Sequence, residues 1–155
     1  MEQSKLQSAL TAQQTPSASS LLNDYLTSIG KGDPKVTASY FTENGCIEAP
    51  YVASFGMSPT ITGKPAIEDV MSNLLMAAPD FRLKNIRMVM ETQDEVVAEY
   101  ESEANMANGR SYRQLYIAHL IAKDGKIVCH REFLNTLSFV AAFFPNGLND
   151  LISKN

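Results

Sequence analysis

The chain has 155 residues, of which 45% are hydrophobic and 19% charged, and these values are ordinary for one globular domain with a substantial core. A formal net charge of −4 at pH 7, without a basic run, argues against nucleic acid or an anionic membrane as a partner. No apolar stretch is long enough to cross a bilayer, and the first residues lack the apolar core of a secretory signal, so we expect a cytoplasmic protein.

Helical signals occupy the first half of the chain. Residues 1–18 lack a sustained apolar period and are predicted to be a tail or a loosely docked arm, followed by a single domain over residues 19–155. Ser19 or Ser20 can cap a first helix that stops at residues 30–32. Its apolar stripe consists of Leu21, Leu22, Tyr25, Leu26 and Ile29.

Two more helices are predicted on either side of a pair of short strands. The second helix begins at Asp33-Pro34, with Asp as the cap, and ends at Asn44-Gly45. Short strands follow at Cys46–Ala49 and near Thr60, joined by an irregular loop. The third helix opens at Gly63-Lys64-Pro65 and ends before Pro79.

Four longer strands follow. Turn signals at residues 92–94, at Asn108-Gly109 and at Asp124-Gly125 separate them, and such dipeptides indicate hairpins. We therefore predict an antiparallel meander of strands 82–91, 96–106, 111–122 and 126–135, followed by a helix over 136–144. The fold class is α+β: a cone-shaped roll with three N-terminal helices packed on a strongly curved, mixed or antiparallel sheet of about six strands, and a short C-terminal helix. Such a cone encloses a natural small-molecule site.

Strand alternation divides the sheet into two faces. On the last strand, Ile127, Cys129, Arg131 and Phe133 are predicted to share one face, and Val128, His130, Glu132 and Leu134 the other. The inner face of the preceding strands is predicted to hold Tyr100, Ser102, Ala104, Tyr112, Gln114, Tyr116, Ala118 and Leu120. The outer face then collects Glu99, Glu101, Glu103, Arg113, His119 and Arg131. The reverse arrangement would bury three glutamates at a heavy desolvation cost.

Potential metal ligands are few. Cys46 and Cys129 are expected to be small buried residues in a reducing compartment, rather than a disulfide or a metal site. The two histidines, His119 and His130, are predicted to face opposite sides of the sheet. Because a metal site needs three or four converging ligands, we expect no metal, and no other cofactor.

The order of these elements resembles the nuclear transport factor 2 and ketosteroid isomerase superfamily, in particular its SnoaL-like branch. The resemblance covers about residues 19–144 and rests on LLNDYLTSIGKGD, GKPAIEDVMSNL, the PDF at Pro79–Phe81, and DGKIVCHREFLNTL. It implies a homodimer formed through the outer face of the long sheet. Tyr25 falls where the steroid isomerases keep the phenol that stabilises the oxyanion, but their base falls at Ala49 and their protonated acid at Ala118.

Two other branches resemble the chain at Glu132. The limonene epoxide hydrolases keep their water-activating aspartate there, but their arginine and second aspartate fall near Tyr100 and Ser102. The REFLN segment resembles the phenazine-biosynthesis branch most closely, and this likeness implies that Glu132 acts as an acid and base. It implies no role for the other pocket residues.

We therefore expect a small cofactorless enzyme that acts on a mostly apolar cyclic or carbonyl-bearing molecule. Glu132, assisted by His130, would move a proton while a tyrosine hydroxyl holds the developing oxyanion, which suits an isomerase, cyclase, hydratase or condensing enzyme. Each side chain also has a structural alternative, as a bonded carboxylate or a satisfied core residue. Ligand contacts are expected from Tyr25, Tyr116, Tyr100, Gln114 and Leu134.

The alternative function is a non-catalytic module of the same fold that binds a small molecule or plays an accessory role. The absence of carboxylates at Ala49 and Ala118 favours this interpretation. Glu48, at the expected mouth of the cone, is a further candidate for a second acid. A binding module is also favoured by a flexible lining of the cone, which could be formed by Met57, Met71, Met76 and Met106.

Overall fold

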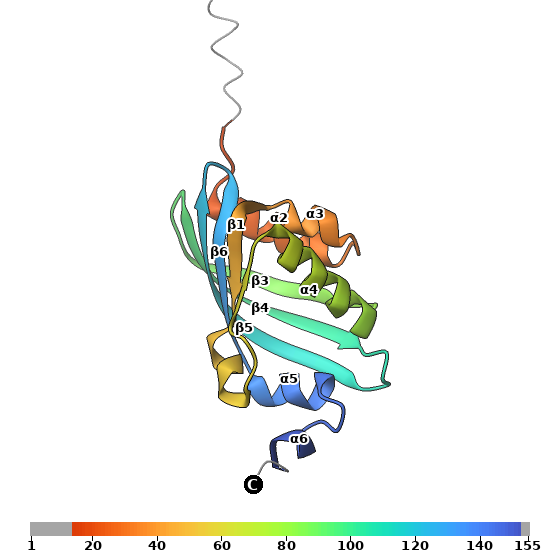
Figure 1. The fold of residues 1–155 in the computed structure, drawn as a ribbon. Helices are drawn as coiled ribbons and strands as arrows, with labels where there is room; N and C mark the ends of the chain where they lie inside the picture. The colour runs from red at the N-terminus through yellow and green to blue at the C-terminus, as the bar shows by residue number, and fades with distance from the viewer. Residues whose placement is uncertain (1–13, 153–155) are drawn as a thin grey trace, which may run out of the picture.

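The computed structural model describes residues 14–152 (Figure 1). Its elements are α2 (Ala18–Ile29), α3 (Pro34–Ala38), β1 (Phe41–Glu48), the 3-10 helix η1 (Pro50–Phe55), β2 (Thr60–Thr62), α4 (Lys64–Ala77), β3 (Arg82–Glu91), β4 (Glu95–Asn105), β5 (Ser111–Lys123), β6 (Lys126–Leu134), α5 (Thr136–Phe143) and α6 (Asn149–Ile152). The predicted α+β class, with helices packed on a six-stranded sheet, is confirmed. Most of the predicted tail, residues 1–13, lies outside the described residues.

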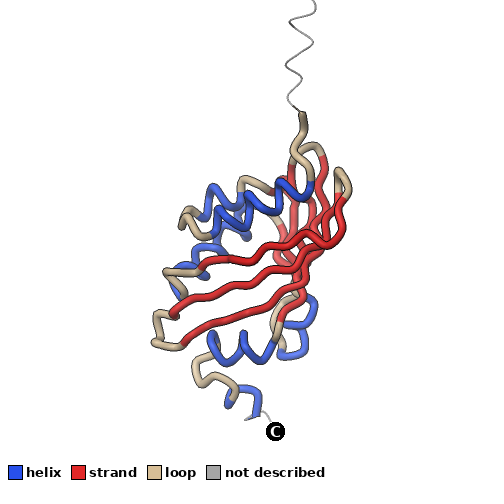
Figure 2. Tube along the Cα trace, turned by 180° about the vertical axis from the view of Figure 1, so that it is seen from behind, coloured by secondary structure: helices blue, strands red, loops and turns tan. Residues whose placement is uncertain are grey.

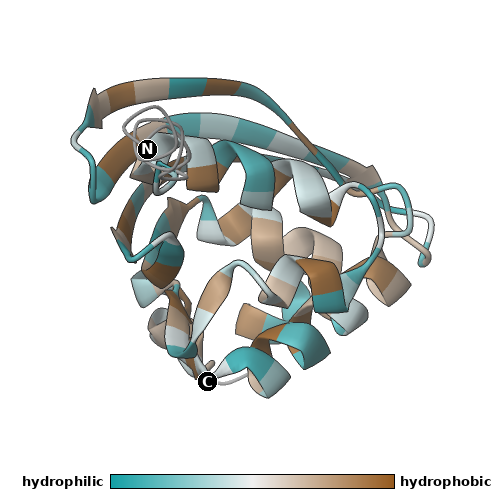
Figure 3. Cartoon of the chain, turned by 90° about the horizontal axis from the view of Figure 1, so that it is seen from above, coloured by the Kyte–Doolittle hydropathy of each residue, from teal (hydrophilic) through white to brown (hydrophobic). Residues whose placement is uncertain are grey.

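One mixed sheet organises the molecule, with the strand order β2-β1-β6-β5-β4-β3. Strands β3 to β6 form the predicted antiparallel meander, whereas β1 runs parallel to β6 and antiparallel to β2. The strands bend strongly (Figure 2), and the view from above shows the sheet as an arc with the helices inside it (Figure 3). The space for a ligand therefore lies between the concave face of the sheet and the helices.

Helix α2 covers one end of the concave face. Its predicted apolar stripe is buried, with Leu22 and Leu26 at 0% and 1% exposure. The N-cap is Ser17, whose side chain accepts a hydrogen bond from the backbone N–H of Ser20, so the cap lies two or three residues before the predicted ones. Burial of this stripe holds Tyr25 against the sheet.

The second predicted helix is too long. Asp33 caps α3 as expected, but the helix ends at Ala38, and Phe41 begins a strand. Phe41 is fully buried, and its ring lies edge-on to that of Tyr25 at 5.1 Å. Gly45 does not end a helix: a Cβ there would lie 2.9 Å from the carbonyl oxygen of Ile127, so glycine lets β1 approach β6 closely. Pairing with β6 thus overrides the local helix signal.

The predicted faces of β4 and β5 are confirmed, but those of β6 need one correction. Ile121 pairs with Cys129 and Ala122 with Ile127, so Val128 is an extra residue in a β-bulge. The bulge shifts the alternation by one residue. Ile127, predicted to face outward, is therefore fully buried on the same side as His130.

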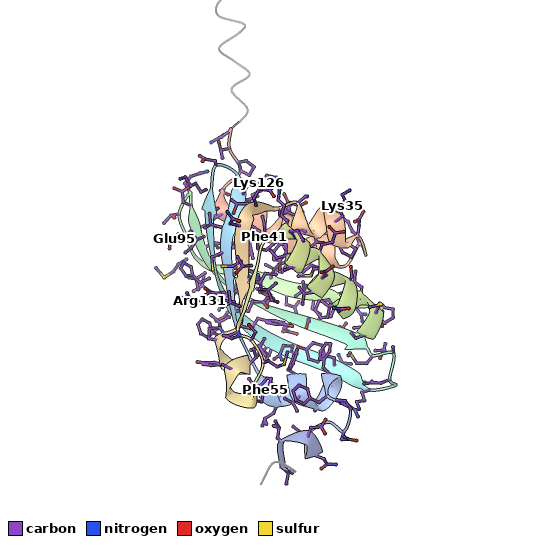
Figure 4. All side chains as sticks on the ribbon, in the orientation of Figure 1. Lys35, Phe41, Phe55, Glu95, Lys126 and Arg131 are labelled. Carbon is purple, nitrogen blue, oxygen red and sulfur yellow. The ribbon has the colours of Figure 1, made fainter. Side chains whose placement is uncertain are left out.

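The outer face of the sheet carries several charged pairs. Glu103 accepts hydrogen bonds from Lys84 at 2.5 Å and from Arg82 and Arg113 at 2.6 Å each. Arg131 and Glu95 lie on the side of the sheet away from α2 to α4 (Figure 4). His119 pairs there with Glu95 at 2.9 Å, as its predicted outward orientation requires. Among residues 14–152, no helix has the length and apolar content needed to cross a membrane.

Candidate active site

A cavity of about 310 Å3 lies between the concave face of the sheet, helices α2, α4 and α5, and the segment 49–61. This volume is at the lower end of the range of small-molecule sites, about 300–1,000 Å3. The described residues that line it include no lysine, arginine or histidine, and Glu132 is their only carboxyl group. Most of the lining is apolar, and the polar side chains are Tyr25, Ser58, Asn73, Tyr112, Tyr116 and Glu132.

Glu132 is held by a side chain that projects from β4. The Tyr100 hydroxyl donates a hydrogen bond to Oε1 of Glu132 and lies 3.0 Å from Nε2 of His130. Oε2 of Glu132 has no hydrogen-bond partner among the described residues. The only fully enclosed side-chain polar atom without a partner in residues 14–152 belongs to His130, so Oε2 is not sealed off. Because Glu132 lines the cavity, this oxygen is available to a bound molecule.

His130 lies behind Glu132 rather than on the cavity wall. It is fully buried, and its Nε2 is 3.6 Å from Oε1 of Glu132. Since the single hydroxyl proton of Tyr100 is donated to Glu132, the Tyr100 oxygen must accept from Nε2–H of His130. The chain of donors therefore runs from His130 to Tyr100 to Glu132. It leaves Nδ1 of His130 without a partner among residues 14–152.

Tyr25 faces the cavity from α2. Its ring lies edge-on to the His130 ring, with centroids 5.1 Å apart. Its hydroxyl makes no hydrogen bond with the described residues and is not among their enclosed, unpaired polar atoms. Because Tyr25 lines the cavity, this hydroxyl is a free donor for a ligand.

A second polar network supports the tyrosines of β5. Tyr116 stacks on Tyr100 at 4.9 Å, and its hydroxyl lies 2.9 Å from Oγ of Ser102 and 3.4 Å from the Tyr112 hydroxyl. The side-chain amide of Gln114 donates to the Tyr112 hydroxyl at 3.2 Å and to the backbone carbonyl of Asn135 at 2.9 Å. Gln114 thereby holds the start of α5 against β5, the strand that carries Tyr112 and Tyr116.

Burial sets the protonation of these groups. It raises the pKa of Tyr25, Tyr100 and Tyr116 well above the ordinary value, and the nearby Glu132 carboxylate adds to the effect. Burial lowers the pKa of His130, against an opposing influence of Glu132. The tyrosines therefore remain hydrogen-bond donors, and the imidazole is uncharged near neutral pH.

The predicted site residues divide into two layers. Glu132, Tyr25, Tyr116 and Leu134 line the cavity, whereas His130, Tyr100 and Gln114 are buried behind it. Of the four methionines proposed for the lining, Met57 and Met71 take part; Met76 is exposed and Met106 is buried elsewhere. Glu48 accepts a hydrogen bond from Arg131 and does not line the cavity.

Several lining residues were not predicted. Phe139 and Phe143 close the cavity from α5, while Ser58 and Asn73 lie at its exposed rim. The apolar character of α5 was visible in the sequence, but its position under the sheet depends on tertiary contacts such as those made by Gln114.

The only group of three or more His, Cys, Asp or Glu side chains in residues 14–152 with spacing suited to a metal ion lies outside the cavity. It consists of Cys46, Glu48 and Cys129. Both cysteines are half-buried rather than buried. The sequence did not predict their proximity, because it depends on the parallel pairing of β1 with β6.

Comparison with known proteins places the chain among small α+β domains. The SnoaL-like domain matches residues 22–130. The Bacillus subtilis (strain 168) protein YesE is 30% identical over 114 residues, which are 72% of this chain and 76% of YesE. A crystal structure from B. subtilis, provisionally described as an isomerase, has a TM-score of 0.73 at 27% identity and covers 81% of this chain and 91% of its own. A phenazine biosynthesis-related protein from Pseudomonas aeruginosa has a TM-score of 0.69 at 22% identity, with coverages of 81% and 83%.

Proposed function

The chain belongs to the SnoaL-like domain family, and from this premise we propose that it is a small enzyme that moves a proton on a bound small molecule. The molecule is mostly apolar, with a ring or a carbonyl group, because the cavity offers an apolar wall and few polar groups. The reaction is of the isomerase, cyclase, hydratase or condensation type and needs no cofactor. The provisional description of the B. subtilis crystal structure as an isomerase supports this class.

Glu132 acts as the general base and acid in this proposal. The observation that carries it is the unequal use of the two carboxylate oxygens. Tyr100 holds Oε1, whereas Oε2 has no partner among the described residues and belongs to a side chain on the cavity wall. A base fixed by one oxygen and open at the other can take a proton from a ligand without first breaking its support.

Tyr25 supplies the oxyanion donor. Its hydroxyl is free, it lines the same cavity as Glu132, and burial keeps its pKa high, so it stays protonated while charge develops on a carbonyl oxygen. Tyr100 and His130 are positioning residues for the carboxylate. Tyr116 and Leu134 contact the ligand from the sheet.

Exchange of α-hydrogens for deuterium tests this function without requiring the natural substrate. Small cyclic ketones and enones are incubated with the protein in D2O, and NMR measures exchange at the carbon beside the carbonyl. We expect the wild type to accelerate exchange and Glu132→Gln to reduce the rate by about 10²–10⁴-fold, the usual contribution of a general base. Glu99→Gln, which removes a carboxylate from the outer face, is the matched control and should exchange like the wild type.

Three outcomes distinguish the hypotheses. Wild-type exchange by a folded Glu132→Gln variant would exclude this carboxylate as the base. Saturable stabilisation by the ketones in a thermal melt, without exchange in the wild type, would instead support the non-catalytic binding module. Loss of exchange in Tyr25→Phe, with ligand-induced stabilisation retained, would support the role of the phenol.

A further inference from the structure

Two thiols and a carboxylate converge on the convex side of the sheet. Cys46 and Glu48 are two residues apart on β1 and therefore project from the same face. The parallel pairing of β1 with β6 sets Cys46 beside Cys129 and Glu48 beside Arg131. The two Sγ atoms and a carboxylate oxygen all lie within 4.8 Å of one another.

We propose that Cys46, Cys129 and Glu48 form a binding site for a divalent ion of borderline softness, with Zn²⁺ as the best fit. Thiolate sulfur and carboxylate oxygen are both common zinc ligands, and thiolates disfavour Mg²⁺ and Ca²⁺. Zn–S bonds of about 2.3 Å in a tetrahedron hold ligand atoms about 4 Å apart, so side-chain rotation alone brings these groups into range. The three side chains are half-buried, so water completes the coordination.

With Arg131 included, the net charge of the site is zero whether or not the metal ion is bound. Its Nε donates a hydrogen bond to Oε2 of Glu48 at 2.5 Å, which leaves Oε1 for the metal and orients the carboxylate as an outer-shell group does. Without a metal, the two neutral thiols, the carboxylate and the guanidinium sum to zero charge. Exchange of two thiol protons for one divalent ion leaves that sum unchanged, so a half-buried patch is not left with excess charge.

A metal ion at this site would bridge two strands that are far apart in the sequence, because Cys46 lies on β1 and Cys129 on β6. The ion would join β1 to β6, the strand that carries Glu132, and so stabilise the sheet independently of any reaction in the cavity.

Cobalt binding to the full chain tests the proposal. The protein is kept reduced with a phosphine and titrated with Co²⁺, whose thiolate charge-transfer absorption reports sulfur ligation, and Zn²⁺ is then added as a competitor. We expect one equivalent of Co²⁺ with thiolate absorption, displaced by Zn²⁺, and a Zn²⁺-dependent rise in melting temperature. Cys46→Ser and Cys129→Ser should each lower the thiolate absorption and weaken Zn²⁺ binding by at least about tenfold.

Two carboxylate variants complete the design. Glu48→Gln should retain sulfur ligation but bind Zn²⁺ about 10–100-fold more weakly, as for the loss of a supporting metal contact. Glu99→Gln, on the same face but paired with Arg87, should bind like the wild type. Absence of thiolate absorption in the reduced wild type would overturn the proposal. So would Zn²⁺ stabilisation that persists in a folded Cys46→Ser/Cys129→Ser variant. Neither result depends on the exchange activity of Glu132.

Discussion

Tyr100 and Glu132 are hydrogen-bonded although their strands are not neighbours. Tyr100 lies on β4 and Glu132 on β6, with β5 between them. The β5 residue paired with Glu132 is Ala118, which also pairs with Ala98 on β4. Because both side chains are single methyl groups, no bulky group stands between the Tyr100 hydroxyl and the Glu132 carboxylate on the concave face. The small side chain at position 118 thus makes room for this contact.

Replacement of Tyr100 by phenylalanine should reduce activity more than it reduces binding. The change removes the donor to Oε1 of Glu132 and the acceptor for His130 while it keeps the ring that stacks on Tyr116. A hydrogen bond to a charged group contributes about 1.5–3 kcal/mol, so we expect the deuterium-exchange rate to fall by about 10–100-fold. Ketone affinity, measured by thermal melts, should change little. An exchange rate within about twofold of the wild type would show that Tyr100 does not position the base.

A larger side chain at position 118 should break the same contact by bulk. Ala118 is fully buried, and we expect Ala118→Leu to lower the free energy of unfolding by about 1–3 kcal/mol and to reduce exchange as strongly as Tyr100→Phe. Ala118→Gly is the matched control, since it keeps the space and costs about 0.5–1 kcal/mol of stability. Urea unfolding and the exchange assay measure the two effects. Full exchange activity in the leucine variant would contradict this role for Ala118.

Acid should remove the stabilisation that Glu103 provides. Hydrogen bonds, first from Lys84 and then from Arg82, lower the pKa of Glu103 from about 4.5 to about 2. A carboxyl with a depressed folded-state pKa stabilises the fold above its unfolded pKa, and the contribution disappears as the pH falls through the folded value. Stability should therefore fall between about pH 4.5 and pH 2. Glu103→Gln should lose less stability than the wild type over this interval in urea unfolding, and an identical loss would refute the assignment.

The convex face should mediate dimer formation. Leu115 and Ile117 are 68% and 51% exposed there, beside the ring of Phe133. Exposed apolar residues gathered on one face indicate a protein contact, and we expect a homodimer in sedimentation equilibrium. Ile117→Asp should shift the protein toward the monomer. Met76→Asp, on the exposed side of α4, is the control and should leave the mass unchanged. A wild-type monomer at high concentration would exclude this interface.

Local signals predicted the meander well. The observed β3 coincides with the predicted strand 82–91, and the turn at Asp124-Gly125 lies where its dipeptide places it, with Asp124 at φ 51° and Gly125 at φ 74°. The alternation of side chains along the strands also predicted correctly that Tyr100, Tyr116 and Glu132 lie on the concave face. These features depend on residues that are close together in the sequence, so local patterns are enough to predict them.

Contacts between distant segments account for the errors. The sequence around Phe41 is compatible with a helix, and only pairing with β6 makes it a strand. The meeting of Cys46 with Cys129 has the same origin. The assignment of Tyr100 as a ligand contact remains a prediction, although its hydroxyl is bonded to Glu132. That bond joins residues two strands apart, a relationship that no local pattern in the sequence contains.

The bulge at Val128 determines where β6 can tolerate an insertion or a deletion. Ile127 and the pair His130 and Glu132 must all face the interior, yet their spacing is out of phase for a regular strand. Val128 absorbs the difference, so β6 carries one spare residue at this point. A deletion of Val128 would restore regular pairing and keep Glu132 facing the cavity, whereas a deletion or insertion between His130 and Glu132 would turn the carboxylate outward. Among related chains, insertions and deletions in β6 should therefore lie between the turn at Asp124-Gly125 and His130.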